Sequence, residues 1–287
     1  MARKPIFGYC SGWKTNGVAA GSTYLATGAQ VNIPIVGAAP YNPKNRIRPP
    51  LMDASAFLAY IIQAKKSPGF TFAAIMKSAW HTKLLINSAV LSWDANNNSD
   101  EFAWRFSDGT STRDFVGCRC ASVAIIGSGD GRGGQLVRMD WLARQGESDA
   151  TGAPAFSAFV TDGGQATGID EVDWTGTATG VRAHSINLMR VQIPDYQEDK
   201  TLFASRIESL GFYGSVTLQM DPDGTPPANI GGTATVKFGT TPNGVQYAMN
   251  IDNDHETYPL DPSQLGTVTR QYELVNAGLI PIAVTSF

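Results

Sequence analysis

The residues that could carry out chemistry in this chain are few and scattered. Its three histidines, His81, His184 and His255, are far apart, and none belongs to a His-x-x-x-His pair. A serine or cysteine nucleophile needs a neighbouring base and a third group that orients the base. The sequence also has no Gly-x-Ser-x-Gly elbow and no Walker-type Gly-Lys-Ser/Thr. We therefore assign no catalytic residue and expect that the protein is not an enzyme.

One glycine motif formally matches the dinucleotide-binding fingerprint. It reads Gly129-x-Gly131-x-x-Gly134. That fingerprint requires a strand before it and a helix N-terminus after it, so that backbone N–H groups meet the pyrophosphate. Residues 122–126 do predict a strand, but residues 135–142 alternate as a second strand instead of beginning a helix. We expect residues 127–134 to be a hairpin loop, and we assign no cofactor-binding residue.

Three short segments could hold a metal ion, and each has a simpler interpretation. The acidic runs 252–256 and 221–224 are oxygen-rich, as calcium loops are, but neither fits the twelve-residue calcium loop. Cys118 and Cys120 are two residues apart in a predicted strand, and no second cysteine pair completes a zinc site. We expect solvated turns and buried thiols, with no metal site and no cofactor.

The chain has three cysteines, Cys10, Cys118 and Cys120, which make no disulfide framework. This favours synthesis in a reducing cytosol.

The composition points to a β-rich globular protein. Apolar residues make up 43% of the 287 residues, enough for a packed core, while charged residues make up 16%, against about 25% in an average domain. The 30 glycines and 16 prolines favour many short strands joined by turns over a helical bundle. The net charge of −3 shows none of the basic excess of a duplex-binding protein. We find no signal peptide and no apolar run long enough to insert in a membrane.

Period-two alternation defines the strands that we expect. Apolar residues alternate with polar ones in six stretches: Phe102, Trp104 and Phe106; Val137, Met139 and Trp141; Val216, Leu218 and Met220; Ala234, Val236 and Phe238; Val245, Tyr247, Met249 and Ile251; and a last run over Val268, Arg270, Tyr272 and Leu274. Such alternation is typical of an antiparallel sheet with one wet face. We expect about nine or ten strands in all.

A single helix is expected beside this sheet. The candidate covers residues 53–66, with Asp53 able to cap its first turn and Pro68 with Gly69 able to end it. Four apolar residues would share one face of that helix: Phe57, Leu58, Ile61 and Ile62. We expect the helix to lie on the flank of the sheet.

Changes of composition divide the chain into regions. Residues 1–50 are rich in glycine and proline and form an N-terminal arm with loops. Residues 51–287 form one β domain. Within it, residues 145–183 are a loop or insertion rich in Gly, Ala, Thr and Asp, and residues 265–287 are a C-terminal strand or arm.

Two pairs of segments resemble the tail tube proteins (major tail proteins) of long-tailed bacteriophages. The first pair is Phe115-Val-Gly-Cys-Arg-Cys-Ala-Ser-Val-Ala-Ile-Ile, a glycine loop, and Gln135-Leu-Val-Arg-Met-Asp-Trp-Leu-Ala-Arg-Gln-Gly-Glu. The second pair is Ala183-His-Ser-Ile-Asn-Leu-Met-Arg-Val-Gln-Ile and Ile207-Glu-Ser-Leu-Gly-Phe-Tyr-Gly-Ser-Val-Thr-Leu-Gln-Met, which is similar to the family's second inner hairpin. The similarity covers residues 80–145 and 183–252, about half of the chain.

The resemblance implies a mainly β fold, an antiparallel β-sandwich or split barrel with one flanking α-helix and long loops. It also implies a structural virion protein that assembles into rings, usually of six subunits, which stack into the tail tube and conduct double-stranded DNA into the host. The implied partners are other copies of the chain, a tape-measure protein and a tail terminator. The implied location is the virion tail, after synthesis in the bacterial cytoplasm. Ser215, Thr217, Gln219 and Asn187 could line a wet lumen.

Two other kinds of protein remain open from the sequence. A capsid decoration protein or minor tail β-sandwich protein would share the strand pattern without polymerising. A carbohydrate-binding jelly roll would use exposed aromatics, for which Trp13, Trp80 and Trp174 are candidates because they lie in or near less regular segments.

Overall fold

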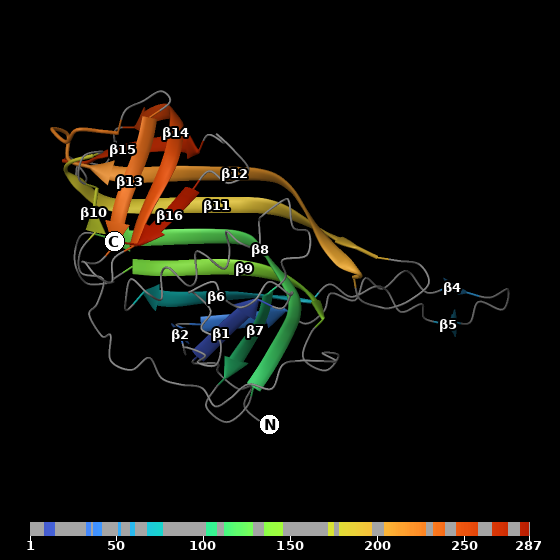
Figure 1. The fold of residues 1–287 in the computed structure, drawn as a ribbon. Coiled ribbons are helices and arrows are strands. Elements are labelled where there is room, and N and C mark those ends of the chain that lie inside the picture. Colours follow the sequence, from blue (N-terminus) through green and yellow to red (C-terminus); the bar gives the residue numbers. More distant parts are fainter. Residues whose placement is uncertain are drawn as a thin grey trace.

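The described part of the protein is built entirely from β-strands. The structure is a computed structural model, and it describes residues 9–14, 33–35, 37–41, 51–52, 58–60, 68–76, 102–107, 112–128, 135–145, 172–174, 178–196, 204–227, 232–238, 245–257, 266–274 and 282–286. These residues contain sixteen strands and no helix (Figure 1). The strands are β1 (Tyr9–Lys14), β2 (Ile33–Pro34), β3 (Gly37–Tyr41), β4 (Leu51–Met52), β5 (Leu58–Tyr60), β6 (Gly69–Met76), β7 (Phe102–Ser107), β8 (Thr112–Ser128), β9 (Gln135–Gln145), β10 (Val172–Asp173), β11 (Val181–Asp195), β12 (Arg206–Met220), β13 (Gly232–Phe238), β14 (Val245–Thr257), β15 (Val268–Leu274) and β16 (Ile282–Ser286).

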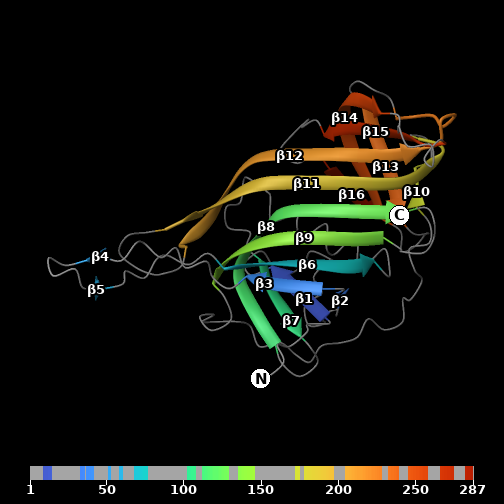
Figure 2. The same cartoon turned by 180° about the vertical axis from the view of Figure 1, so that it is seen from behind.

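One antiparallel sheet contains fourteen of these strands. Its main path runs in the order β10-β13-β14-β15-β12-β11-β8-β7-β1-β2, and a branch continues from β8 through β9 and β6 to β3. Strands β4 and β5 form a separate two-stranded pair. The long strands lie side by side, while β13, β14 and β16 cross them at one end of the molecule (Figures 1 and 2). The sheet therefore curls on itself and encloses its own core.

The branch arises because β8 is long enough to pair with two strands along one edge. Its first half pairs with β7 up to Cys118, and its second half pairs with β11 from Ser122 onward. The other edge of β8 pairs with β9 from Val116 to Ile126. The strand changes direction between the two halves, where Gly117 has a φ of 66° and the pairing with β9 shifts register between Cys120 and Ser122. Only glycine adopts such a φ without strain.

The apolar side of the alternation forms a continuous core. In β7 the side chains of Phe102, Trp104 and Phe106 are all buried, as the alternation predicts. Aromatic rings from β6, β7, β8 and β9 pack together at one end of this core, with the Trp104 and Trp141 ring centroids 5.1 Å apart. Tilted and edge-on arrangements of this kind are favourable for aromatic pairs. The packing holds β7 and β6 over the bend of β8.

The strands predicted from alternation are confirmed. They correspond to β7, β9, β12, β13, β14 and β15, and the predicted hairpin pairs β8 with β9 in antiparallel register. The total of sixteen exceeds our expectation of nine or ten, and four of the additional strands, β2, β4, β5 and β10, contain only two or three residues each. Strands so short carry no readable alternation. The mainly β, antiparallel class is therefore correct for the described residues.

The predicted helix over residues 53–66 falls largely outside the described residues. The part that is described, Leu58–Tyr60, is strand β5 paired with β4, and not a helical turn. At these three residues strand pairing replaces the helix that local pattern favours, since propensity is a weak prior against tertiary context.

The N-terminal region contributes strands to the main sheet. Within residues 1–50, β1 pairs with β7 along six positions and β3 pairs with β6. In the region 145–183, the described residues are the last residue of β9, the short strand β10, Trp174, residues 178–180 and the start of β11. The glycine loop at 129–134 lies outside the described residues.

The bend at Gly117 provides a stability test. A Cβ at this position would lie 2.5 Å from Nε and 3.0 Å from Cβ of Arg144, and the positive φ adds backbone strain. We expect Gly117→Ala to lower the free energy of unfolding by about 2 kcal/mol in urea titrations. Gly211→Ala is the matched control, because a Cβ there meets nothing within 4 Å and φ is not positive. Equal stability of the two variants would contradict the role of Gly117.

Candidate interaction surface

The β11–β12 hairpin continues beyond the sheet as a two-stranded ribbon. Strand β11 pairs with β8 only from Ala183 to Met189, and β12 pairs with β15 only from Ser215 to Met220. The hairpin itself stays paired as far as Asp195 and Arg206. We call residues 190–195 and 206–214 the distal ribbon. Neither of its outer edges has a strand partner among the described residues, and it extends past the long strands of the sheet in both views (Figures 1 and 2).

Hydrogen bonds fasten the inner face of the distal ribbon to β8. The Gln192 side chain donates from Nε2 to the Cys120 carbonyl at 2.8 Å, where β8 has ceased to pair with β11. Gln192 Oε1 accepts from Ser209 Oγ at 2.7 Å, and Arg119 donates from Nη1 to Ser209 Oγ at 3.5 Å. The inner cluster of Arg119, Gln192 and Ser209 thus takes the place of the strand pairing that ends at Met189.

Arginine side chains are buried on this inner face. Arg119 is 1% exposed and Arg190 is 7% exposed. Arg190 donates from Nε to the Leu210 carbonyl at 2.9 Å, next to the register shift between Arg190 and Gln192. Buried cations are costly unless hydrogen bonds satisfy them. Their presence shows that the ribbon is held by directed polar contacts as well as by the apolar Ile207, which is 1% exposed.

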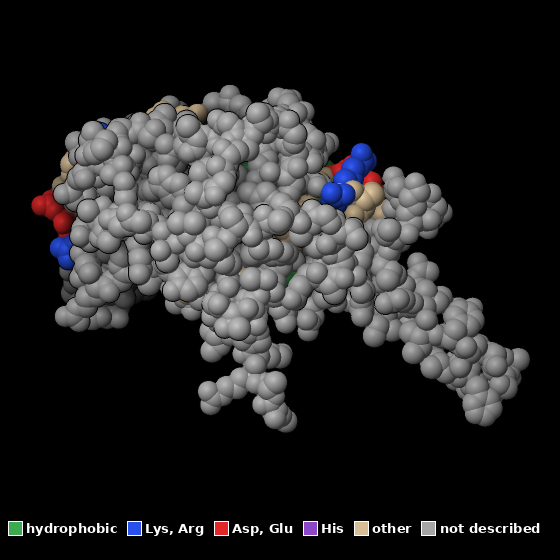
Figure 3. All heavy atoms as spheres, turned by 60° about the horizontal axis from the view of Figure 1, so that its bottom comes forward, with side chains coloured by type: hydrophobic (Ala, Val, Ile, Leu, Met, Phe, Trp, Pro, Cys, Tyr) green, Lys and Arg blue, Asp and Glu red, His purple; other side chains and the backbone are tan. Residues whose placement is uncertain are grey.

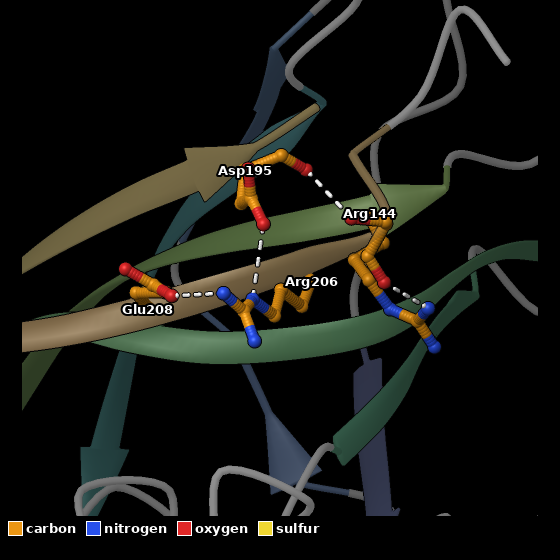
Figure 4. Close-up of polar contacts among 5 residues, drawn as sticks. Arg144, Asp195, Arg206 and Glu208 are labelled. Atoms are coloured by element: carbon orange, nitrogen blue, oxygen red, sulfur yellow. Dashed lines mark hydrogen bonds and ion pairs between the residues drawn. The ribbon is translucent and has the colours of Figure 1, made fainter. Parts of the chain in front are cut away.

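Ion pairs gather where the two strands of the ribbon end. Arg206 contacts Asp195 Oδ2 at 3.0 Å through Nε and Glu208 Oε1 at 2.6 Å through Nη2 (Figure 4). Arg144, at the end of β9, donates to the Ser205 carbonyl at 2.7 Å, and Ser205 Oγ donates to the Asp195 carbonyl at 3.1 Å. The Arg206 side chain is 57% exposed, so its ion pairs contribute little to stability. They do leave this end of the ribbon with balanced charge.

The outer face of the distal ribbon carries exposed apolar side chains, and so does the adjoining end of the sheet at Met189. Five large hydrophobic side chains are between 45% and 51% exposed: Met189, Val191, Ile193, Leu210 and Tyr213. Among the residues whose side-chain burial is described, these are all the strongly exposed large hydrophobic ones. Met189 lies directly opposite Tyr213 across the hairpin. We call this set the apolar stripe.

The rest of the outer sheet face is polar, with uncharged side chains beside the exposed charged residues Arg138 and Glu273. Asn187 is exposed, Thr217 and Gln219 are half-buried, and Ser215 is 7% exposed. They share the face opposite the core, since Ile186, Val216 and Leu218 beside them are buried. The four residues predicted to line a wet surface are therefore brought together on neighbouring strands.

Charges of opposite sign lie next to one another on the described surface. Arg182 pairs with Asp221, and Arg270 pairs with Glu256 at 2.6 Å. In the space-filling view, the coloured charged side chains form two groups at opposite ends of the molecule, and each group contains both signs (Figure 3). This mixed distribution differs from the one-sided basic surface of a duplex-binding protein.

The histidines are not assembled into a site. His184 lies in β11 and is buried edge-on against Trp174, with ring centroids 5.7 Å apart. His255 lies in β14 opposite Gln271, and His81 is outside the described residues. Burial lowers the pKa of His184 from 6.5 to about 4, so the imidazole is neutral at neutral pH.

The cysteines and acidic runs lie in ordinary structural positions. Cys118 and Cys120 are free and buried in β8, as predicted, and burial raises the pKa of the Cys120 thiol well above its usual value. Residues 252–256 belong to strand β14, which corrects their interpretation as a turn. Residues 221–224 do form a turn, and Asp221 is paired with Arg182. Among the described residues, no cluster of three or more His, Cys, Asp or Glu is placed to hold a metal ion.

Comparison with known proteins adds no relative. The chain matches no protein-family model, and no curated protein matches its sequence. Within the described part of the chain, no helix is long and apolar enough to cross a bilayer. The apolar stripe was not apparent in the sequence, because its residues belong to an alternating pattern that predicts a strand without saying which face is covered.

The burial of His184 makes stability depend on pH. The folded state has the lower pKa, so the unfolded state binds more protons between pH 6.5 and pH 4, and stability falls as the pH drops through that window. We expect the free energy of unfolding to decrease by about 2 kcal/mol between about pH 7.5 and pH 5 on account of this group. In His184→Phe that decrease should be smaller by the same amount. An unchanged pH profile in urea titrations would contradict the assignment.

The inner cluster predicts a second effect on stability. Gln192→Leu removes the donor to the Cys120 carbonyl and the acceptor for Ser209, and we expect a loss of about 1–3 kcal/mol in the free energy of unfolding. Gln271→Leu makes the same chemical change at an exposed position of β15 and should alter stability by less than about 0.5 kcal/mol. Equal effects of the two substitutions would show that the inner cluster does not fasten the ribbon.

Proposed function

We propose that the protein is a structural virion protein, a subunit of the tail tube of a long-tailed bacteriophage. In this proposal subunits form rings, of six copies by the family resemblance, and the rings stack into a tube. The tube is built with a tape-measure protein and a terminator, and double-stranded DNA passes through it into the host. The described fold supports the proposal without testing the assembly itself.

One observation carries this proposal. The four segments that resemble the inner hairpins of tail tube proteins lie in β8, β9, β11 and β12, which are consecutive in the order β9-β8-β11-β12. Segments 183–193 and 115–126 are far apart in the sequence, yet β11 and β8 pair from Ala183 to Met189. Two long hairpins joined edge to edge make a four-stranded unit, whose outer edges pair with β6 and with β15 over much of their length. In the proposed tube, a neighbouring subunit would continue the barrel from the part of β12 that β15 leaves unpaired, residues 206–214.

The two faces of this four-stranded unit suit a tube wall. One face packs on the core through residues such as Ile125, Ile186 and Val216. The opposite face carries uncharged side chains such as Asn187 and Thr217, together with the exposed Arg138 and the half-buried Asp140 of β9. Clustered Lys and Arg would retain DNA by neutralising phosphates and releasing counterions. A polar face of mixed charge instead allows DNA to slide, and we assign this face to the lumen in the proposed tube.

Two other functions fit the β-rich fold, namely a capsid decoration or minor tail protein and a carbohydrate-binding module. A glycan site commonly uses exposed aromatic rings, but Trp174 is only 5% exposed and packs on His184. Trp80 lies outside the described residues. No observation on the described residues favours either function over the tail tube.

Electron microscopy tests the proposal directly. The purified protein is examined in negative stain over a concentration series, with light scattering in parallel. We expect hollow rings or tubes of uniform width, because free sheet edges favour closure between copies. A monodisperse monomer or compact trimer at every concentration, also after addition of preformed tail initiation complexes, would contradict it.

A further inference from the structure

The distal ribbon buries polar side chains on its inner face, beside Ile207, and exposes apolar side chains on its outer face, where Glu208 lies opposite Ile193. Arg190, Gln192 and Ser209 face inward, toward β8, whereas the apolar stripe faces outward. In a sheet with one wet face the polar residues point to solvent. Single exposed hydrophobic residues are ordinary, but among the residues whose side-chain burial the structure describes, every strongly exposed one lies on one hairpin. A gathered apolar surface of this kind marks a contact site.

The ribbon also has an open backbone edge beside the stripe. Strand β12 pairs with β15 only from Ser215, so residues 206–214 have no described strand on the side away from β11. Unpaired N–H and C=O groups along such an edge accept an additional strand. The other edge of the ribbon contains Pro194, which has no N–H to donate. The β12 edge is therefore the one suited to strand addition.

Charge identifies the kind of partner. Among the described residues at the end of the ribbon, Arg144 and Arg206 are balanced by Asp195 and Glu208 (Figure 4). A nucleic acid requires an excess of cations, and a strongly charged protein partner requires an excess of the opposite sign. A balanced, apolar surface meets no net repulsion from a surface like itself.

We propose that the apolar stripe and the open β12 edge are a subunit contact, and that their occupant is a second copy of this chain. A strand of the second copy adds to the β12 edge, and its apolar side chains pack beside Leu210 and Tyr213 as cross-strand neighbours. The inference deepens the proposed function and rests on it for the ring geometry, since a contact between different surfaces of identical subunits closes into a ring or continues as a filament.

The area of the contact indicates that the apolar stripe and the open β12 edge are both needed. Each partner in a stable interface buries about 800 Å². Five side chains that are each about half exposed supply only part of that area. The strand pairing along residues 206–214 and the polar groups at the ribbon end complete the contact.

The experiment compares full-length variants. Val191→Lys combined with Tyr213→Lys places two charges on the stripe, at positions that are each 51% exposed and so tolerate polar side chains. We expect the concentration needed for assembly to rise at least tenfold, measured by light scattering and negative-stain microscopy. Gln271→Lys, at an exposed position of β15, is the control and should assemble like the wild type. Circular dichroism checks that each variant retains its β-structure.

A second measurement uses only the wild type, so it does not depend on a variant that folds. Hydrogen–deuterium exchange is compared between assembled and dissociated protein over residues 206–213. The alternate amides that point away from β11 should be protected only in the assembled protein, since they gain partners from the second copy.

The outcomes separate the two proposals. If the wild type forms rings and the stripe variant does so equally well, with unchanged exchange at 206–213, the contact assignment is overturned and the tail tube proposal stands. If the wild type stays monomeric at every concentration, both proposals fail. If it stays monomeric and binds uncharged lipid vesicles through the stripe, the occupant is a lipid surface and the second-copy assignment is likewise overturned.

Discussion

The architecture depends on one constraint, namely that each backbone N–H and C=O group along an edge of β8 can pair with only one neighbouring strand. Strand β7 pairs along the first half of that edge and β11 along the second. Strand β11 therefore stops pairing with β8 where the pairing of β7 with β8 begins. Because β12 stays paired with β11, the two strands leave the sheet together. The distal ribbon, the inner cluster beneath it and the exposed stripe above it all follow from this division of one edge.

The sequence predicts those features that depend on period-two alternation within a single strand. Trp104 and Trp141 are buried, as their alternation predicts, because a strand with one covered face needs no information from elsewhere in the chain. Alternation fails at Arg119, which lies between two buried cysteines and so is predicted to face solvent, yet is 1% exposed. The distal ribbon covers the second face of β8 at that point, and the hydrogen bond to Ser209 makes the burial possible.

Features that depend on which strands become neighbours could not be predicted from pattern alone. The pairing of β1 with β7, and of β3 with β6, brings residues 1–50 into the main sheet. Neither pairing is encoded in a short hairpin, because each joins segments more than twenty residues apart. The same holds for the apolar stripe. Met189 and Tyr213 have the pattern of ordinary strand residues, and alternation does not say that the outer face on which both lie is left uncovered.

The exposure of apolar side chains on the distal ribbon has an energetic consequence. Its attachment to β8 relies on the burial of Ile207 and on hydrogen bonds, each with a net contribution of only about 0.5–1.5 kcal/mol, while four large apolar side chains of the ribbon are about half exposed. The ribbon is thus the part of the long hairpin with the least apolar burial to hold it in place, and local opening follows low burial. Covering Val191, Ile193 and Leu210 with a second copy would supply the missing burial. In the proposed assembly, ordering of the ribbon and association of subunits are consequently one coupled step, so that the same residues set both the stability of the ribbon and the concentration at which rings form.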